Sequence, residues 1–389
     1  MVALPFLVGI WLLFGLLSFG PAAFIFLYMK RKSKGSWPTK VDANYKPRIS
    51  VIVPTYNESS IIPFKLINLS RLMYPKDMME IVVVDSNSSD DTAEIVRQFS
   101  RKEPQINIEV LVEKERKGKS HALNYALGHC KGDVIIVSDA DCFWPSDILN
   151  KAMPFLADPT VGAIGGPKIL LNANQTWVTR MEERYLKSAN NLRLGESKAG
   201  STVFFEGGFT AFKKETFDRF DPYLTGSDDC GTVIQVIEKS FRTMLVKEGE
   251  FYSTFPVSLR GKLSIKLRRA NQLVRVFAEY LILLVKGKVK TTKKTVIPNI
   301  FLYLISPISF AVLIVLTIFL VLYFPFLLLL LALLIVPGIR FYFYEILESN
   351  ILLLAATFGV VIDKRFSIWS KPEDRIWLTK ETLSQFNLI

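Results

Sequence analysis

Two carboxylates one residue apart, Asp139 and Asp141, directly follow four apolar residues at 134–137. Two neighbouring acids at the end of a buried strand are costly unless a counter-charge neutralises them. Hard oxygen ligands suit Mg²⁺ or Mn²⁺, and either ion stabilises a departing diphosphate as a Lewis acid. We therefore predict that Asp139 and Asp141 hold a divalent cation and a diphosphate. The alternative is a purely structural turn.

A second acidic pair, Asp228 and Asp229, opens a predicted helix over 230–240. Asp229 suits a general base that removes a proton from a hydroxyl group, whereas the same position also suits an N-cap. The Gly207-Gly208 turn, which precedes this pair, leaves backbone exposed for close approach by a ligand.

Polar residues that could bind a nucleoside follow two other apolar runs. Thr55, Tyr56 and Glu58 come after the first run, and Asp85 ends the second. Tyr56 can pack against a base, and the carboxylates can accept hydrogen bonds from the base or ribose. Lys119, in a Lys-Gly-Lys turn at a helix start, can hold a phosphate. The alternatives are capped turns and a solvated basic turn.

Gln272, Arg275 and Arg268 lie near one face of a predicted helix by their three- and four-residue spacing. Guanidinium forks suit a diphosphate, although a basic face on anionic lipid explains the same pattern. The two histidines, His121 and His129, are too few for a usual zinc site. The three cysteines have no CxxC spacing and imply no disulfide framework.

The segment 46–260 must position these residues, because strand and helix patterns alternate along it. We predict an α/β fold with a mainly parallel, doubly wound sheet, which binds ligands beyond the carboxyl ends of its strands. The strands are expected at 49–54, 80–85, 108–112, 133–138, 163–166 and 244–247, with helices near 60–72, 90–101 and 119–130.

Apolar segments flank this domain. Half of all residues are hydrophobic, and they concentrate in 1–30 and 297–362. We expect membrane spans at 2–29, 299–323 and 325–343, with 344–362 partly inserted because Glu345 and Glu348 interrupt it. Residues 261–290 read as an amphipathic interfacial helix, and 363–389 as a polar tail.

The net charge of +12 lies largely beside these apolar segments, at 30–34 and 286–294. This placement favours anionic membrane lipids over nucleic acid as the partner. It predicts a multi-pass protein of the cell membrane whose N-terminus is outside and whose soluble domain is cytoplasmic. A signal peptide is disfavoured, because the positive charges follow the first apolar run.

Taken in order, these motifs resemble the family 2 glycosyltransferases, in particular the membrane branch with cellulose, hyaluronan and chitin synthases. The resemblance covers about 46–280 and extends to the flanking spans. It implies a nucleotide-sugar-binding domain that transfers a sugar, with inversion, from a nucleotide-sugar donor (a UDP-sugar by preference) to a glycan or lipid acceptor.

The resemblance also implies roles for the residues. Thr55, Tyr56, Glu58, Asp85, Lys119 and Asp139 would bind the nucleotide, and Asp141 with Asp139 the metal. Gln272 and Arg275 would contact the diphosphate, and Gly207 and Gly208 the acceptor. Asp229, paired with Asp228, would be the base.

Two departures weaken the likeness to a polymer synthase. Val276 replaces the signature Trp that helps bind a sugar acceptor, and Asp228 replaces the commoner Glu. Transfer of one sugar to a lipid or lipid-linked acceptor is therefore the alternative, as is an inactive nucleotide-sugar-binding subunit. The second would predict loss of Asp141 or Asp229. A nucleotidyltransferase would carry a Gly-rich basic loop after its first strand, and a transporter would need more spans.

Overall fold

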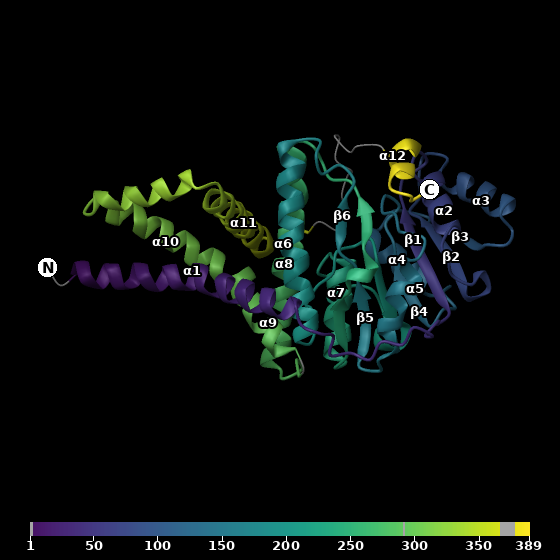
Figure 1. Ribbon diagram of the computed structural model, residues 1–389, viewed down its shortest axis with the longest axis horizontal. Helices are drawn as coiled ribbons and strands as arrows, with labels where there is room; N and C mark the ends of the chain where they lie inside the picture. Colours follow the sequence, from purple (N-terminus) through teal and green to yellow (C-terminus); the bar gives the residue numbers. More distant parts are fainter. Residues whose placement is uncertain (1–2, 291, 366–377) are drawn as a thin grey trace.

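The computed structural model describes residues 3–290, 292–365 and 378–389. Its centre is a seven-stranded sheet of order β3-β2-β1-β4-β7-β5-β8 (Figure 1). Only β7 runs antiparallel to its neighbours, β4 and β5, so the predicted mainly parallel sheet is confirmed. The strands are β1 (Ile49–Thr55), β2 (Met79–Asp85), β3 (Asn107–Val112), β4 (Val134–Val137), β5 (Val161–Gly165), β7 (Thr210–Lys213) and β8 (Arg242–Leu245).

Helices cover both faces of the sheet, as a doubly wound fold requires. Strand residues alternate between two cores, so that Val51 and Val53 face one core and Ile52 the other. The first core packs against α2 (Ile62–Ser70), α3 (Thr92–Lys102) and α5 (Ile148–Ala152). The second packs against α4 (Lys119–Leu127) and α7 (Asp228–Glu238). A small parallel pair, β6 (Lys168–Leu170) and β9 (Phe251–Ser253), lies beside the main sheet, and short 3₁₀ turns occupy Lys76–Met78, Met153–Ala157, Lys214–Thr216 and Lys247–Gly249.

Two long helices, α6 (Trp177–Ala199) and α8 (Leu259–Val285), stand between the sheet and the apolar helices (Figure 1). Their first turns are capped, because the hydroxyl groups of Thr176 and Ser258 accept hydrogen bonds from backbone N–H groups. Helix α8 buries Phe277 and Tyr280 against the sheet domain, and Ala270 and Val274 against α11. It is therefore packed on both sides.

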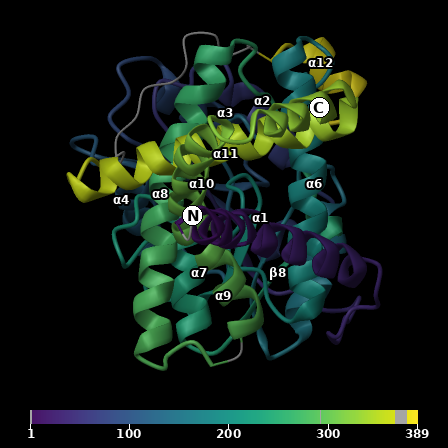
Figure 2. The same cartoon turned by 90° about the vertical axis from the view of Figure 1, so that its left-hand side faces the viewer.

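Three helices of the described chain are long and apolar enough to cross a membrane: Leu4–Ser33, Lys293–Val321 and Pro337–Val361. They belong to α1 (Ala3–Ser33), to the continuous series α9 (Lys293–Ile300), η5 (Phe301–Ile305) and α10 (Ser306–Val321), and to α11 (Pro337–Val361). Figure 2 views the molecule from the side of these helices.

The start of α11 differs from the expectation, which placed a span at 325–343 and a partly inserted segment at 344–362. In place of a span at 325–343, the short helix η6 (Pro325–Ile335) is followed by α11, which begins at Pro337, a residue suited to a first helical turn. Glu345 and Glu348, expected to interrupt a span, lie inside α11 because lysines of α8 pair with them.

The expected polar tail is described only at 363–365 and 378–389. Contrary to that expectation, its last part packs into the core, where Leu383 and Leu388 are buried around the short helix α12 (Lys380–Gln385). The Asn68 side chain of α2 donates a hydrogen bond of 2.7 Å to the Leu388 carbonyl oxygen. Apolar residues spaced around Thr379–Gln385 explain why this segment docks.

Candidate active site

One cavity of about 700 Å³ connects the carboxyl ends of β1 and β4 with helices α6, α8 and α11. We call its two parts the sheet end, with Tyr56, Lys119, Asp139, Asp141, Asp228 and Asp229, and the helix end, with Glu182, Tyr185, Lys266, Ser349, Leu352 and Leu353. Every predicted site residue lines this cavity except Asp85 and Gly208.

Asp85 lies beneath the sheet end, and its carboxylate accepts hydrogen bonds from other residues of the chain. Thr55 Oγ1 donates to Asp85 Oδ1 over 3.2 Å, and the Ser88 N–H donates to Asp85 Oδ2 over 2.9 Å. With 2% exposure, Asp85 fixes the two loops that follow β1 and β2.

Gly208 is likewise set behind the cavity wall. Its φ is +138°, and a Cβ there would lie 2.3 Å from the Phe251 ring. Its carbonyl oxygen accepts hydrogen bonds from Trp144 Nε1 at 2.7 Å and Ser138 Oγ at 3.2 Å. The close packing explains the glycine.

Asp139 and Asp141 meet at the end of β4, where ligand atoms of Asp139, Asp141 and Cys142 all lie within 4.8 Å of one another. Burial raises the pKa of the Cys142 thiol well above its usual range, so the carboxylates are the better ligands. Two carboxylate donors fit Mg²⁺ or Mn²⁺, whose other positions a diphosphate and water would fill.

Lys119 joins the two acidic pairs. Its Nζ lies 2.7 Å from Asp139 Oδ1 and 2.9 Å from Asp228 Oδ2. Burial alone would lower the pKa of Lys119, but the charges of Asp139 and Asp228 raise it above its usual value. Burial and the nearby Asp229 raise the pKa of Asp228, which Lys119 opposes. The lysine therefore stays charged and holds the acids together.

Asp229 sits in the first turn of α7 with one oxygen anchored. Its Oδ1 accepts hydrogen bonds from Ser227 Oγ at 2.5 Å and from the Cys230 N–H at 2.7 Å. A Cβ on Gly207 would lie 3.5 Å from Asp229 Oδ2, 3.3 Å from Asp139 Oδ2 and 3.5 Å from Lys119 Nζ. Gly207 thus leaves open the space that these charged groups share.

Gln272 and Arg275 line the cavity from α8 while contacting other parts of the chain. Gln272 Nε2 donates to the Gly226 carbonyl oxygen, which ties α8 to the loop before α7. Arg275 Nη2 lies 3.2 Å from the Lys364 carbonyl oxygen and 3.3 Å from an Asp363 carboxylate oxygen. The residues that follow α11 therefore contact α8 beside the cavity.

Two residues at or beneath the sheet end belong to none of the motifs found in the sequence. The Arg116 guanidinium stacks 3.8 Å from the centre of the Tyr56 ring. Lys65 is fully buried and donates hydrogen bonds of 2.6 Å to Ser138 Oγ and to the Cys142 carbonyl oxygen, on either side of the Asp139–Asp141 turn. A lone lysine within the apolar helix α2 was the only sequence signal for this support.

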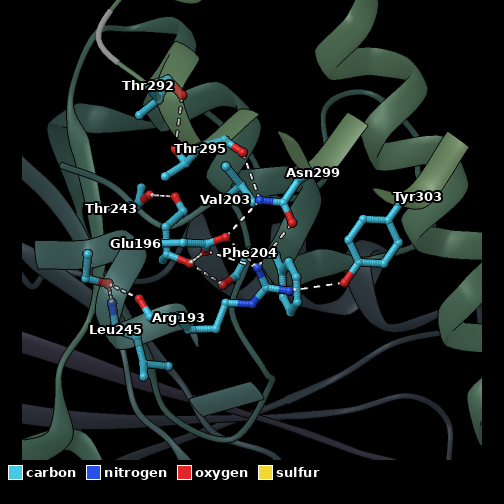
Figure 3. A network of polar contacts seen from close by, with 12 residues as sticks. Arg193, Glu196, Val203, Phe204, Thr243, Leu245, Thr292, Thr295, Asn299 and Tyr303 are labelled. Atoms are coloured by element: carbon cyan, nitrogen blue, oxygen red, sulfur yellow. Dashed lines mark hydrogen bonds and ion pairs between the residues drawn. The ribbon is translucent and has the colours of Figure 1, made fainter. Parts of the chain in front are cut away.

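The wall of the helix end rests on a buried network between α6 and α9 (Figure 3). Arg193 pairs with Glu196 at 2.9 and 3.0 Å, and Asn299 donates to Glu196 at 2.8 Å. The Arg193 guanidinium also stacks 3.2 Å from the Phe204 ring centre and donates to Tyr303 Oη at 3.1 Å. The network fixes two aromatic rings that line the cavity.

Comparison with solved structures gives a match along nearly the whole chain. The fold is similar to "Mannosyltransferase PcManGT from Pyrobaculum calidifontis in complex with GDP-Man and Mn2+", with a TM-score of 0.78 and 31% identity. The match covers 92% of this chain and 100% of that chain. It confirms the expected nucleotide-sugar-binding glycosyltransferase fold.

Curated relatives match over shorter stretches. The beta-monoglucosyldiacylglycerol synthase of Synechocystis sp. is 35% identical over 34% of this chain, and the N-acetylglucosaminyltransferase of Rhizobium meliloti is 26% identical over 60%. The chain spans 28% and 58% of the lengths of these two proteins.

The family model described as "Glycosyltransferase like family 2" matches residues 47–272, which include every predicted site residue except Arg275. The chain therefore belongs to the family 2 glycosyltransferases.

Proposed function

We propose that this chain is a membrane-bound, inverting glycosyltransferase that moves a single sugar from a nucleoside diphosphate donor to a hydroxyl of a lipid or lipid-linked acceptor. The observation that carries the proposal is one continuous cavity, lined at one end by acids suited to a metal and a base and at the other by α11, a candidate membrane span. Donor and acceptor can meet there without leaving the membrane surface.

The reaction forms one bond and breaks one bond. The acceptor oxygen bonds to the anomeric carbon while the bond from that carbon to the diphosphate oxygen breaks, and the nucleoside diphosphate leaves with the electron pair. Asp229 takes the acceptor proton, and hydrogen bonds from Ser227 Oγ and the Cys230 N–H orient its carboxylate. Asp139 and Asp141 would hold Mg²⁺ or Mn²⁺, which supplies charge neutralisation for the leaving diphosphate.

For the nucleoside, Tyr56 with its stacked Arg116 offers a flat surface for the base, and Glu58 accepts hydrogen bonds beside it. The first donor to test is GDP-mannose, because the similar mannosyltransferase was solved with GDP-Man and Mn²⁺. UDP-sugars, favoured by the motifs alone, are the second panel.

The residue at one position favours transfer of a single sugar over polymer synthesis. Val276, where the synthase signature has Trp, is fully buried in the core and is not part of the cavity wall. An aromatic acceptor platform is thus absent from that position. A relative named for the synthesis of a glucosyl lipid supports the same choice.

For orientation, we propose that the sheet domain is cytoplasmic. The basic residues that end α1 and those at 286–294 lie where the apolar helices meet this domain (Figure 1). Positive charge at this boundary favours the cytoplasmic leaflet. In the same arrangement, α8 and α6 lie along the membrane surface, since both cross the direction of α1 in the figure.

The test is release of nucleoside diphosphate by the protein in phosphatidylcholine nanodiscs that also contain a hydroxyl-bearing acceptor (diacylglycerol or decyl glucoside), with GDP-mannose and UDP-sugars, with Mn²⁺ and with chelator. We expect metal-dependent release from one donor, and loss of metal dependence together with at least about 100-fold slower release in Asp141→Asn. Failure to bind any nucleotide sugar in the presence of Mn²⁺ would refute the proposal.

A further inference from the structure

The helix end of the cavity contains a buried carboxylate that has no role in the reaction proposed above. Glu182 of α6 is 1% exposed, lines the cavity, and lies 3.4 Å from Lys266 Nζ. The ion pair joins Lys266 to Oε2, and beyond this ion pair that oxygen accepts no hydrogen bond within the described part of the chain. A buried carboxylate oxygen without a donor is costly, and a bound hydroxyl group would satisfy it.

We propose that the helix end is a saccharide-binding subsite. It binds the uncharged, hydroxyl-rich headgroup of a glycolipid acceptor, with Glu182 accepting hydrogen bonds from the headgroup. This inference rests on the proposed function, and it narrows the acceptor from any lipid to a lipid that already carries a sugar.

The charge of the helix end favours a neutral headgroup over a phosphate. Lys266 Nζ faces three carboxylates, those of Glu348 at 2.9 Å, Glu182 at 3.4 Å and Glu345 at 3.7 Å. The ion pairs around this end join two cations, Lys262 and Lys266, to three carboxylates, those of Glu182, Glu345 and Glu348, a net charge of −1. Carboxylates repel an anion but accept hydrogen bonds from hydroxyl groups.

A second buried carboxylate oxygen that accepts no hydrogen bond lies between the two ends of the cavity. Glu206 precedes Gly207 and lines the cavity, and its Oε2 also accepts no hydrogen bond from any described residue. Two such oxygens along one wall match a ligand with several hydroxyl groups, one of which must reach Asp229. A simple alcohol would satisfy only one of them.

The apolar residues of α11 that line the cavity suit the lipid part of the same acceptor. Leu352 and Leu353 line the cavity from α11, which is long and apolar enough to span a membrane. Tyr303 packs with these leucines and is held by the Arg193 network (Figure 3), and Tyr185 lies with its ring centre 4.5 Å from Lys266 Nζ. Tyrosine suits a boundary between apolar and charged groups, because its ring is apolar and its hydroxyl is polar.

The test compares acceptors of different charge. The protein in phosphatidylcholine nanodiscs is supplied with the donor and Mn²⁺, and release of nucleoside diphosphate is followed as decyl glucoside, decyl mannoside or decyl phosphate is added. We expect at least one decyl glycoside to accelerate release with saturation, and decyl phosphate to have no effect. Acceleration by decyl phosphate alone, or by none of these probes while the donor still binds, would overturn the proposal.

A matched pair of variants locates the effect. Glu182→Gln keeps the size of the side chain but removes its charge, and should raise the half-saturating glycoside concentration about tenfold or more. Glu183→Gln alters the next residue, which pairs with Lys187 at 2.8 Å on the outer face, and should change nothing. Equal glycoside saturation in the two variants would contradict the subsite.

Donor affinity separates this inference from the proposed function. The affinity for the donor with Mn²⁺ should be unchanged in Glu182→Gln. The same measurement shows that the variant is correctly folded. If neither the wild type nor the variants bind a donor, the proposed function itself fails. If all bind the donor and none discriminates between glycoside and phosphate, only the saccharide subsite fails.

Discussion

The two ends of the cavity differ in how completely their charged groups are paired. At the sheet end, Lys119 lies within 2.9 Å of two carboxylates, and these three residues come from the turn after β4 and from the first turns of α4 and α7, which pack on the sheet. At the helix end, Glu182 and Lys266 come from two helices and Glu348 from a third, and carboxylate oxygens without hydrogen-bond donors occur among the described residues. The first arrangement is nearly self-sufficient, whereas the second has unused hydrogen-bonding capacity.

This difference teaches where specificity can be encoded. A nucleotide and a metal are common to many enzymes, and strand ends of an α/β sheet hold them at fixed positions. The acceptor differs between enzymes, and here its part of the cavity depends on how α6, α8 and α11 pack. A substitution at the sheet end should therefore change the chemical step, whereas one at the helix end should change acceptor use or the packing of the membrane helices.

The largest expected effect is on catalysis at the sheet end. Asp229→Asn should lower kcat by about 10²–10⁴, because a general base contributes that much, while donor affinity changes little. Steady-state release and calorimetric titration of the donor measure the two quantities. Asp218→Asn, an exposed acid paired with Lys239 at 2.7 Å, is the control. A kcat equal to that of the control would remove Asp229 from the proposed mechanism.

The next effect is on stability at the helix end. Lys262 is 1% exposed and pairs with Glu348 at 2.7 Å, so Lys262→Met leaves the partly buried Glu348 with Lys266, at 2.9 Å, as its counter-charge and removes one cation from the cluster. Loss of about 3 kcal/mol of unfolding free energy is expected, against less than about 1 kcal/mol for the exposed Lys187→Met. Denaturant titration of both variants measures this. Similar losses would mean that the α8–α11 pairing adds little stability.

A smaller loss should follow from filling the shared space at the sheet end. In Gly207→Ala, the new Cβ lies 3.3 Å from Asp139 Oδ2, where the bound donor must pass, and kcat/KM should fall about 100-fold. Gly128→Ala, whose Cβ would meet its nearest atom at 3.6 Å, should be silent. An active Gly207→Ala enzyme would show that the donor does not use this space.

The sheet end was largely predictable because its signals are local. An acid placed directly after a β-branched run, as Asp139 is after β4, must lie at the carboxyl edge of a buried strand. Gly207 was recognisable for the same reason, since a glycine-rich turn has few other uses. Lys65 was not recognised, because its hydrogen bonds to Ser138 and Cys142 join residues 73 and 77 positions apart.

The helix end was not predictable for the opposite reason. Glu345 and Glu348 looked like interruptions of an apolar segment, and nothing along the chain indicates that Lys262 and Lys266 would pair with them about 80 residues away. The same lack of local signal misplaced the division of the C-terminal spans. Strand β7 was missed as well, because it pairs antiparallel between β4 and β5, out of the strand–helix alternation.

The most gradual effect concerns pH and the support beneath the sheet end. Burial lowers the pKa of Lys65 from 10.5 to about 7, so between these values the unfolded chain binds a proton that the folded chain does not. Stability contributed by this group should therefore rise with pH from about 7 to 10.5, by at most about 1.4 kcal/mol per pH unit, and level off below 7. The neutral amine still has two N–H donors, enough for Ser138 and Cys142.

Lys65→Met separates this contribution from those of groups distant from the Asp139–Asp141 turn, which titrate equally in both proteins. The difference in unfolding free energy between wild type and Lys65→Met, measured by denaturant titration at steps from pH 6.5 to 10, should grow with pH. Parallel curves would mean that Lys65 stays charged beneath the Asp139–Asp141 turn. The sheet end would then depend on a buried ammonium group for its charge balance, and the contrast between the two ends of the cavity would be smaller than the geometry indicates.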